Sequence, residues 1–494
     1  MTSLYNLFVS VCSRLSETRA IVFHNQTITY GTLYANVQKI YENLLAHGVQ
    51  TGDVVGLLLK RSPSALATML AVLKLGATYL PLNTLQPNDE LERILKESDC
   101  KFIVNDHSSG KMNFNGLWIS LSEFDYHICQ HHNFEHIAGD YSKNCMYIIY
   151  TSGSTGKAKG VPIRQESINN LVLYGTKEIG LSAGHSIVAF SDFSFDMSIP
   201  ECIMPMLIGM CVVLLDDEES QNPRLIRKNI HQQNISTLLI TPTRMRTLLD
   251  CKRDNSFLRG VQYVLFGAEI IPYALLEEIR SATTAKIYNL YGPTETTAYV
   301  TFSDITNKNT IDIGQPVKNT FVYLMSEQCE VINGPGQGEL VIGGIGVAEG
   351  YLSDNTKHAF RVIPEVSDLP VYFTGDIAQR LETGELVYIG RCDNQVKYRG
   401  FRLGIEAIEC TIRAQIKEIC DCAVCVCQKG DAEYLAMVYT AERSLTKFDF
   451  RQRLKGHLPS YAMPVSLIRV AALPENRNHK IDRLTVAKIA QKYV

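Results

Sequence analysis

Apolar segments with the length of buried strands alternate with segments of helical period over the first 300 residues of the chain. VVGLLL at 54–59 predicts a buried strand, and ALATMLAVLKLG at 65–76 predicts a helix that ends at a glycine. The alternation continues with strands expected at 77–82, 212–215, 236–241, 261–267 and 285–292. Strands that alternate with helices form parallel sheets, so this part of the chain is expected to have an α/β fold.

The pattern changes twice further along the chain. After about residue 310, short strands with Gly and Pro turns, as in NGPGQGELVIGG at 333–344, indicate a β-rich subdomain. From residue 393 a smaller α+β unit is expected, with helices near 404–416 and 447–457 and a closing helix after Lys480. Because no low-complexity linker is visible, the boundary between 1–392 and 393–494 is predicted to be a tight hinge.

Composition excludes several classes of protein. The chain has 494 residues, 46% of them hydrophobic and 20% charged, as in globular proteins of several domains. The formal net charge is -3 without a basic arm, so nucleic acid is not an expected partner, whereas small anionic ligands remain possible. The longest apolar run, 202–215, is too short to span a membrane and is interpreted as a buried helix followed by a strand. The N-terminal residues have the spacing of an amphipathic helix rather than a signal peptide, which favours a cytoplasmic protein.

The chain contains 14 cysteines, which are expected to be reduced thiols in a cytoplasmic protein. Four of them, Cys420, Cys422, Cys425 and Cys427, form the cluster CDCAVCVC. In a strand Cys425 and Cys427 share one face, so the cluster is interpreted as structural. A metal site is the alternative interpretation.

A glycine-rich loop follows a predicted strand in YIIYTSGSTGKAKGV at 147–161. Glycines let the backbone fold around phosphate oxygens, hydroxyls and N–H groups donate to them, and lysines balance their charge. The sequence is not a Walker A loop, because Ala158 follows Lys157. A phosphate-handling role is predicted over the alternative of a plain surface loop for Thr151, Ser152, Gly153, Ser154, Thr155, Gly156 and Lys157.

TSGSTGKAKG resembles the signature loop of the adenylate-forming enzymes, the superfamily of acyl-CoA synthetases, luciferases and peptide-synthetase adenylation domains. The family usually has Pro where this chain has Ala158. NLYGPTETT at 289–297, VYFTGD at 371–376, YIGR at 388–391 and NRNHKIDR at 476–483 are also similar to family motifs, so the resemblance covers nearly the whole chain. It implies an N-terminal adenylation core, 1–392, with two parallel-type α/β sheets and a β-rich subdomain, and a mobile C-terminal lid, 393–494.

The resemblance also implies a nucleotide site with ATP and Mg²⁺ as cofactors. Asn289 and Tyr291 match positions that contact adenine, and Thr294 matches a residue that contacts the α-phosphate. Glu295 matches the metal ligand, and its carboxylate oxygens suit a hard cation such as Mg²⁺. Asp376 matches the carboxylate that binds the ribose hydroxyls, although Phe373 stands where the family usually has Arg. The remaining residues assigned to this site are Gly267, Ala268, Glu269, Leu290, Gly292, Tyr388 and Arg391.

Two features of the C-terminal region are implied by the same resemblance. Asp393 matches the hinge residue about which the small domain turns between two reaction steps. Lys480 matches the catalytic lysine, a compact charge that can bridge the attacking carboxylate and the phosphate. Gly404 replaces a glutamate that is usual in the family. This replacement is expected to affect the interface for thioester formation and not adenylation.

FSFDMSIPE at 193–201 bears on the acid that is activated. A carboxylate among apolar residues needs a cationic partner, and Asp196 matches the residue that binds the substrate ammonium group in amino-acid-activating members. A structural or capping role is the alternative for Asp196. The residues that match the family's side-chain pocket are all uncharged, which favours a small α-amino acid such as glycine or alanine. These pocket residues are Met197, Pro200, Leu239, Leu265, Gly267, Leu290, Ala298 and Tyr299. Lys480 is expected to contact the carboxylate of the amino acid.

The sequence is therefore interpreted as a stand-alone amino-acid adenylating ligase. It is expected to convert a small α-amino acid and ATP to aminoacyl-AMP and pyrophosphate, and to transfer the acyl group to the phosphopantetheine thiol of a separate carrier protein. D-alanine–carrier protein ligases are a subtype that stays open. An acyl- or aryl-CoA synthetase and a non-catalytic binding module are the alternatives.

Overall fold

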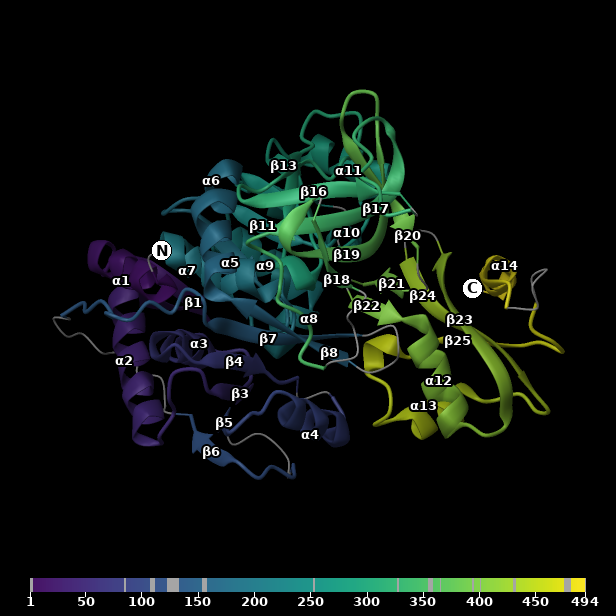
Figure 1. Ribbon diagram of the computed structural model, residues 1–494, viewed down its shortest axis with the longest axis horizontal. Coiled ribbons are helices and arrows are strands. Elements are labelled where there is room, and N and C mark those ends of the chain that lie inside the picture. Colours follow the sequence, from purple (N-terminus) through teal and green to yellow (C-terminus); the bar gives the residue numbers. More distant parts are fainter. Residues whose placement is uncertain are drawn as a thin grey trace. The chain divides into compact units, whose positions relative to one another are not determined.

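The computed structural model describes residues 3–83, 86–106, 112–121, 133–152, 158–251, 254–326, 328–353, 359–364, 366–392, 395–399, 401–429, 432–474 and 481–493. The chain divides into two compact units, whose elements are labelled in Figure 1. The first unit comprises Met1–Thr84, Glu92–Tyr150 and Gly160–Gly390. The second comprises Leu85–Leu91, Thr151–Lys159 and Arg391–Val494.

A nine-stranded sheet forms the centre of the first unit. Its order is β15-β14-β13-β12-β11-β9-β10-β1-β2, and the strands from β1 to β13 in this order are parallel, with antiparallel strands at the edges. The bounds are β1 (Arg19–Phe23), β2 (Gln26–Thr29), β9 (Ser186–Ala189), β10 (Cys211–Leu214), β11 (Thr237–Ile240), β12 (Tyr263–Phe266), β13 (Lys286–Tyr291), β14 (Thr301–Asp304) and β15 (Gln315–Pro316).

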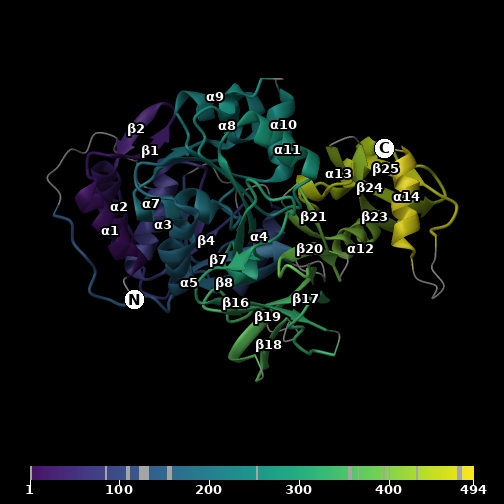
Figure 2. The same cartoon turned by 90° about the horizontal axis from the view of Figure 1, so that it is seen from above.

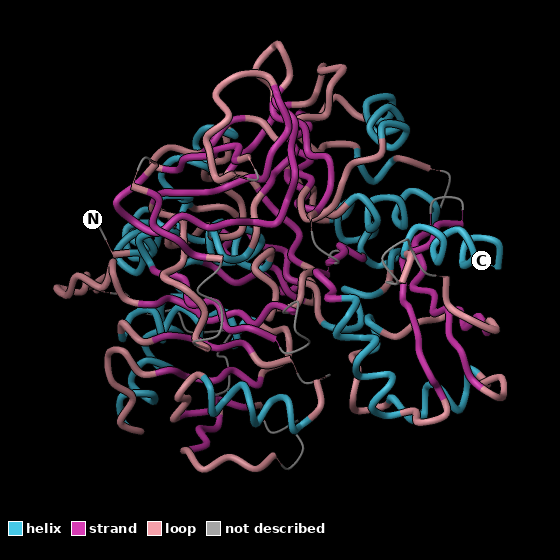
Figure 3. Tube along the Cα trace, turned by 45° about the vertical axis from the view of Figure 1, so that its right-hand side comes forward, coloured by secondary structure: helices cyan, strands magenta, loops and turns pink. Residues whose placement is uncertain are grey.

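A second sheet has the order β6-β5-β3-β4-β7-β8. Its strand pairs from β6 to β7 are parallel, as the alternation of helices and strands predicts. The bounds are β3 (Val54–Leu58), β4 (Thr78–Pro81), β5 (Phe102–Asn105), β6 (Leu117–Ser120), β7 (Cys145–Ser152) and β8 (Ala158–Arg164). Figure 3 draws the strands of both sheets in magenta and the helices in cyan.

Helices of the first unit cover both faces of the nine-stranded sheet. Side chains of β9 alternate between two cores: Ile187 joins the core that also holds residues of the six-stranded sheet and of α1, α2 and α3, whereas Val188 joins the core formed with α9, α10 and α11. The bounds of the helices up to residue 282 are α1 (Leu4–Arg14), α2 (Tyr30–Ala46), α3 (Pro63–Leu75), α4 (Asn88–Glu97, whose first turn belongs to the second unit), α5 (Gln165–Asn170), α6 (Thr176–Ile179), α7 (Met204–Ile208), α8 (Asp217–Gln221), α9 (Pro223–Gln232), α10 (Pro242–Cys251) and α11 (Tyr273–Ala282).

The sequence explains the ends of α3. The Ser62 hydroxyl accepts a hydrogen bond from the Ala65 backbone N–H at 3.2 Å, and Pro63 occupies the first turn, where no backbone donor is needed. Gly76 ends the helix in the left-handed conformation with φ 68°. Two short π-helical segments, η1 (Leu171–Gly175) and η2 (Ile199–Ile203), continue into α6 and α7.

The β-rich part of the first unit is an antiparallel sheet of β16 (Thr320–Met325), β17 (Gly336–Gly344), β19 (Ser367–Arg380) and β18 (Phe360–Ile363), with β20 (Leu386–Arg391) paired to β19. Figure 2 shows β16, β17, β18 and β19 lying together. This confirms the change of pattern that the sequence predicts after residue 310.

The second unit contains a sheet of β23 (Ile419–Lys429), β24 (Ala432–Ala441) and β25 (Ser466–Arg469), and a hairpin of β21 (Gln395–Tyr398) and β22 (Phe401–Gly404). Its helices are α12 (Ile405–Gln415), α13 (Lys447–Leu454) and α14 (Arg483–Tyr493). The fold class is confirmed as mixed α/β with several sheets, and the domain boundary at residue 392 stays a prediction.

The cysteine cluster lies on β23. Cys422 is buried with Val424 on one face, whereas Cys425 and Cys427 share the other face with their sulfur atoms 3.8 Å apart. Burial raises the pKa of Cys425 to about 12, and every cysteine that the structure describes is a free thiol. These contacts support the structural interpretation of the cluster. Among the described residues, no helix combines the length and apolar character needed to cross a membrane.

A buried ion pair anchors the start of α14, which follows the segment that contains Lys480. Arg483 donates to both carboxylate oxygens of Glu409 at 2.8 and 2.9 Å, and the Val424 backbone N–H donates to the same carboxylate at 2.7 Å. Glu409 is 2% exposed. The pair therefore connects α12, β23 and α14.

We expect Glu409→Ala to destabilise the second unit by about 3 kcal/mol, because it leaves a partly buried guanidinium and a buried N–H without their acceptor. Denaturant unfolding followed by circular dichroism measures the change. Glu418→Ala is the control, since Glu418 pairs with Arg453 at an exposed site. Equal shifts of the two variants would contradict the structural role of the buried pair.

Candidate functional site

The carboxyl ends of β9, β11, β12 and β13 meet at one edge of the nine-stranded sheet, because these strands are parallel neighbours. Open α/β sheets bind ligands at this edge. The segments that leave these strands carry eight of the residues that the sequence assigns to the site: Asp196, Met197, Gly267, Ala268, Glu269, Gly292, Thr294 and Glu295.

Asp196 and Thr294 lie in contact although they are far apart in the sequence. The Thr294 hydroxyl donates to Asp196 Oδ2 at 2.6 Å. Thr294 begins the short helix η4 (Thr294–Thr296) directly after β13, and Asp196 lies in the segment after β9. The structure thus brings together the residue assigned to the substrate ammonium and the residue assigned to the α-phosphate.

Glu295 is 1% exposed and accepts a hydrogen bond from the Tyr351 hydroxyl at 2.6 Å. Burial and then the Glu295 carboxylate raise the pKa of Tyr351 far above its usual value, so this hydroxyl stays protonated and donates. A carboxylate held in this way suits Mg²⁺, which is usually bound by one or two carboxylates together with substrate phosphates and water. The chemistry of Glu295 therefore fits the metal that the sequence implies.

Asp376 is 2% exposed and lies among hydroxyl groups. Its Oδ2 accepts from Tyr291 at 2.7 Å, its Oδ1 lies 3.5 Å from the Tyr388 hydroxyl, and its backbone N–H donates to Thr374 Oγ1 at 2.9 Å. Burial and then the charge of Asp376 raise the pKa of Tyr291 well above its usual value. The structure therefore brings together Tyr291, Tyr388 and Asp376, three residues that the sequence assigns to the nucleotide.

Two more residues assigned to the nucleotide are held by neighbouring backbone. The Asn289 side-chain amide donates to the Asp312 carbonyl at 2.7 Å, and Glu269 Oε2 accepts from the Thr243 backbone N–H at 2.9 Å. Both residues therefore have orientations set by the sheet and its connections.

An apolar cavity of about 20 Å³ lies beside this edge of the sheet. Five of the eight residues predicted for the side-chain pocket line it: Pro200, Leu239, Leu265, Leu290 and Tyr299. Met204, Ile208 and Met210 are also part of its lining. Two of the other predicted residues, Met197 and Gly267, lie next to each other. A Cβ added at Gly267 would lie 3.5 Å from the Met197 sulfur. The cavity has room for about one water-sized group.

The backbone turns back on itself after β13. A Cβ at Gly292 would lie 2.6 Å from Tyr299 Cα and 2.8 Å from the Val300 nitrogen, so only glycine fits there without a backbone shift. Thr297 and Ala298 have left-handed φ values of 72° and 58°, which cost free energy in residues with a Cβ. Strain of this kind concentrates at functional sites.

Several predicted site residues cannot be placed in this site. Gly153, Ser154, Thr155, Gly156, Lys157, Asp393 and Lys480 lie outside the described residues, so their roles stay predictions. Thr151 and Ser152 end β7, and β8 begins at Ala158, so the glycine-rich segment connects two neighbouring strands. Thr151 and Arg391 belong to the second unit.

Sequence reasoning missed three residues that organise the site. Tyr351 donates to Glu295, and Glu201 and Arg61 hold the backbone before Asp196. Tyr351 falls within the segment GELVIGGIGVAEGYL, which is similar to a family motif, so a signal was present. Glu201 follows Asp196 by five residues within an apolar stretch, where a carboxylate signals a buried network.

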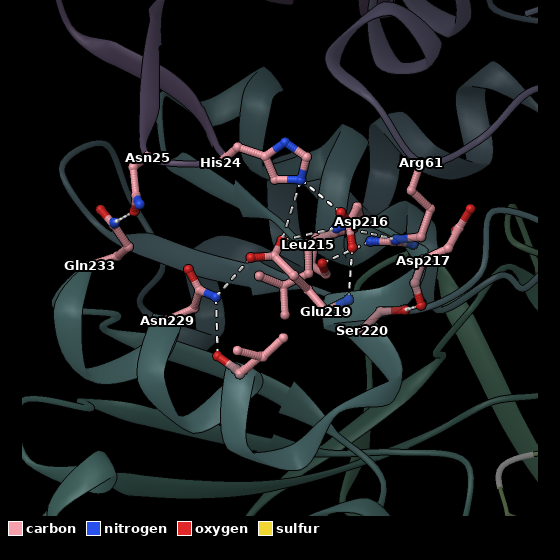
Figure 4. A network of polar contacts seen from close by, with 12 residues as sticks. His24, Asn25, Arg61, Leu215, Asp216, Asp217, Glu219, Ser220, Asn229 and Gln233 are labelled. Carbon is pink, nitrogen blue, oxygen red and sulfur yellow. Dashed lines mark hydrogen bonds and ion pairs between the residues drawn. The ribbon is translucent and has the colours of Figure 1, made fainter.

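A separate polar network joins the turn between β1 and β2 to α8 (Figure 4). His24 Nε2 lies 2.7 Å from Asp216 Oδ2 and 4.0 Å from Glu219 Oε2, a group of ligand types that could hold a metal ion. Asp216 caps α8, however, and forms a capping box with Glu219. This accounts for both carboxylates as structural groups.

Comparisons with known proteins show which family and which fold the chain resembles. A family model described as AMP-binding enzyme matches residues 8–352. Tyrocidine synthase 2 from Brevibacillus parabrevis is 30% identical over 497 residues, which cover 99% of this chain and 14% of that protein. Bacitracin synthase 3 from Bacillus licheniformis is 31% identical over 488 residues, which cover 97% of this chain and 8% of that protein. The chain spans less than a fifth of the length of the curated relatives it matches.

Solved structures show the same fold. Holo-PA1221, an NRPS protein containing adenylation and PCP domains, superposes with a TM-score of 0.84 at 26% identity, over 98% of this chain and 84% of that chain. An o-succinylbenzoate CoA synthetase from Bacillus subtilis also has a TM-score of 0.84, at 19% identity and over 98% of both chains. At that identity the likeness to the synthetase concerns the fold alone.

We expect Gly292→Ala to destabilise the first unit by about 1–3 kcal/mol, because the added Cβ meets backbone atoms that cannot give way. Thermal unfolding measures the change. Gly334→Ala is the matched control, since a Cβ there meets nothing within 4 Å. An unchanged midpoint for Gly292→Ala would contradict the tight turn after β13.

Proposed function

Because this chain belongs to the AMP-binding enzyme family, we propose that it activates a small apolar α-amino acid with ATP. In the first step a carboxylate oxygen of the amino acid attacks the α-phosphorus, and the bond from that phosphorus to the bridging oxygen breaks. The products are aminoacyl-AMP and pyrophosphate. In the second step the thiol of a phosphopantetheine-bearing carrier protein attacks the carbonyl carbon, and AMP leaves.

The observation that supports an amino acid most directly is the position of Asp196. Its carboxylate is partly buried, lies at the ligand-binding edge of the sheet, and is hydrogen-bonded to Thr294 of the segment assigned to phosphate. A carboxylate in such surroundings is stabilised by a cation, and the substrate ammonium group supplies one next to the carboxyl group that reacts. An acid without an amine would not supply this cation.

The cavity supports a small apolar side chain. Its described lining carries no charged residue, so an acidic or basic side chain would be desolvated there without a partner. Its volume of about 20 Å³ suits a group such as the methyl of alanine. One additional methylene changes binding by about 1–3 kcal/mol, so slower activation of slightly larger aliphatic amino acids is expected.

Each residue around the nucleotide would have a separate role. Asp376 and Tyr291 would hold the ribose and orient the nucleoside, and Glu295 would hold Mg²⁺. When bound, the metal neutralises charge on the phosphate oxygens. Thr294 would donate to the α-phosphate, and Lys480 would stabilise the charge that develops there. Little proton transfer is required of the protein in such a reaction.

The carrier-protein step is proposed on two grounds. The solved relative holo-PA1221 contains adenylation and PCP domains. The curated relative tyrocidine synthase 2 is a synthase much longer than this chain, which covers 14% of it. Gly404, which replaces a glutamate usual in the family, lies at the end of β22 and directly before α12.

ATP–pyrophosphate exchange tests the proposal. The panel contains the proteinogenic amino acids, D-alanine, β-alanine and several aryl and fatty acids. Exchange with glycine, alanine or D-alanine supports the assignment of Asp196 and the pocket. Exchange with acids that lack an amine would instead establish the acyl- or aryl-CoA synthetase alternative, and CoA dependence of product formation would identify it.

Asp196→Asn is expected to lower kcat/KM for the amino acid about 10²–10³-fold, because the ammonium group loses a partly buried charged partner while the shape of the side chain is kept. Pyrophosphate exchange at varied amino-acid concentration measures the effect. The matched control is Asp304→Asn, which changes an exposed carboxylate that accepts from Thr306. Retention of full activity by the Asp196 variant would refute the proposed role.

Lys480→Ala is expected to lower the rate of exchange about 10²–10³-fold through the loss of a charge that acts in the transition state. KM for ATP should change much less than kcat. Lys488→Ala provides the control, since Lys488 is an exposed lysine on α14. If the Lys480 variant exchanged pyrophosphate at the normal rate, the lysine would have no catalytic part in adenylation.

A further inference from the structure

We propose that Glu201 is a positioning residue for amino-acid activation: with Arg61 it closes residues 190–201 into a fixed loop that holds Asp196 in place. The inference rests on the proposed role of Asp196 in binding the substrate ammonium. It adds two buried residues, Glu201 and Arg61, to which the sequence assigns no contact with ATP or the amino acid.

Glu201 closes the base of this loop with three hydrogen bonds. The residue is 0% exposed, and its Oε2 accepts from the backbone N–H groups of Phe190 and Ser191 at 2.9 and 2.8 Å. Its Oε1 accepts from the Ser191 hydroxyl at 2.6 Å. Phe190 and Ser191 follow β9 directly, whereas Glu201 lies in η2, so one side chain joins the beginning and the end of the loop.

Arg61 holds the same place from the other sheet. Arg61 lies between β3 and α3. Its guanidinium donates to the carbonyls of Leu215 at 2.7 Å and Ala189 at 2.8 Å, and also to the carbonyl of Ser191. Figure 4 shows the contact with Leu215. Its guanidinium carbon lies 5.0 Å from the centre of the Phe193 ring, within the loop. A single cation therefore fixes the ends of β9 and β10 and the first residues of the loop.

Hydrogen bonds inside the loop extend this order to Asp196. Asp192 accepts from the Ser194 backbone N–H at 2.8 Å. The Ser198 hydroxyl donates to the Phe195 carbonyl at 2.6 Å, and the Ile199 N–H donates to the Asp196 carbonyl at 3.0 Å. The backbone around Asp196 is therefore bonded on both sides, and its position follows from the closure at the base.

Two arginines, Arg61 and Arg244, lie close enough to Glu201 to interact with its buried carboxylate. Burial raises the pKa of Glu201, an effect opposed by the bonds from Ser191 and by the charge of Arg61. Arg244, whose guanidinium lies 4.3 Å from the Phe190 ring centre, also interacts with Glu201, and burial lowers the pKa of Arg244 to about 10. An apolar side chain would fill this space at lower cost, but it could not accept the two backbone N–H groups. What the carboxylate contributes is the fixed backbone.

The test compares Glu201→Ala with Glu201→Gln in pyrophosphate exchange, with alanine and ATP varied separately. Glu201→Ala is expected to raise KM for alanine about tenfold with little change in KM for ATP, because Asp196 loses its fixed position. Glu201→Gln should stay within about threefold of the original KM, since its carbonyl oxygen can accept both backbone N–H groups and its amide can donate to Ser191.

Ser236→Ala is the matched structural control. Ser236 and Ser186 are hydrogen-bonded at the opposite end of β9, so this variant weakens the same strand without touching the loop. Its KM for alanine should be unchanged at a similar loss of melting temperature. An equal rise of both KM values in Glu201→Ala, or no rise in a folded protein, would overturn the proposal.

If Glu201→Ala does not fold, Ser191→Ala tests the positioning role in its place. It removes one of the three bonds, and is expected to raise KM for alanine about threefold without changing KM for ATP. An unchanged KM for alanine would count against the positioning role.

Amide hydrogen exchange separates this inference from the proposed function, because it needs no substrate. Faster exchange confined to 190–201 in Glu201→Ala supports the closure of the loop, and unchanged exchange there overturns it. If the original protein activates acids that lack an amine, and not amino acids, the proposed function fails whatever the exchange of this loop shows.

Discussion

The register of the parallel strands is the constraint on which the rest of the site depends. Leu239 of β11 lies opposite Leu265 of β12, and Leu265 lies opposite Tyr288 of β13. A shift by one residue would turn Leu239 and Leu265 to the other face of the sheet, away from the cavity that they line. The lining of the cavity is therefore set by the register of the sheet. The segments that leave β9 and β13 at the same edge of the sheet bring Asp196 and Thr294 into contact.

Buried carboxylates of the first unit are held by protonated donors rather than left to solvent. Glu295 has the Tyr351 hydroxyl, Asp376 has the Tyr291 hydroxyl, and Glu201 has backbone N–H groups. An ionised group in such a place is costly unless hydrogen bonds or opposite charges compensate it. Because the tyrosines stay protonated, these bonds persist at neutral pH. The carboxylates thus keep one orientation before a ligand arrives, which reduces the cost of binding.

The sequence predicts most of the fold, because hydrophobic period and glycine signals depend on neighbouring residues. The helix that ends at Gly76 and the strands β3, β4, β10, β11, β12 and β13 lie where the pattern places them. It does not reveal which distant residues meet. The contact of Tyr351 with Glu295 and the three carbonyls held by Arg61 arise from tertiary packing, for which a single sequence carries no period or spacing. Family motifs supplied Asp196, Thr294 and Asp376, whereas the residues that hold them in place had to come from the structure.

Residues that follow a strand of the β-rich sheet also hold the segment that contains Glu295. The Ala348 backbone N–H donates to the Glu295 carbonyl at 2.9 Å, and the Thr297 hydroxyl donates to the Gly346 carbonyl at 2.6 Å. These bonds offset the strain of the left-handed residues after Glu295, which a free loop would relax. Since Tyr351 follows in the same segment, the bonds that maintain the strained turn also bring the hydroxyl to the Glu295 carboxylate. The Glu295 carboxylate is thereby positioned by the segment that follows β17 as much as by the strand that precedes it.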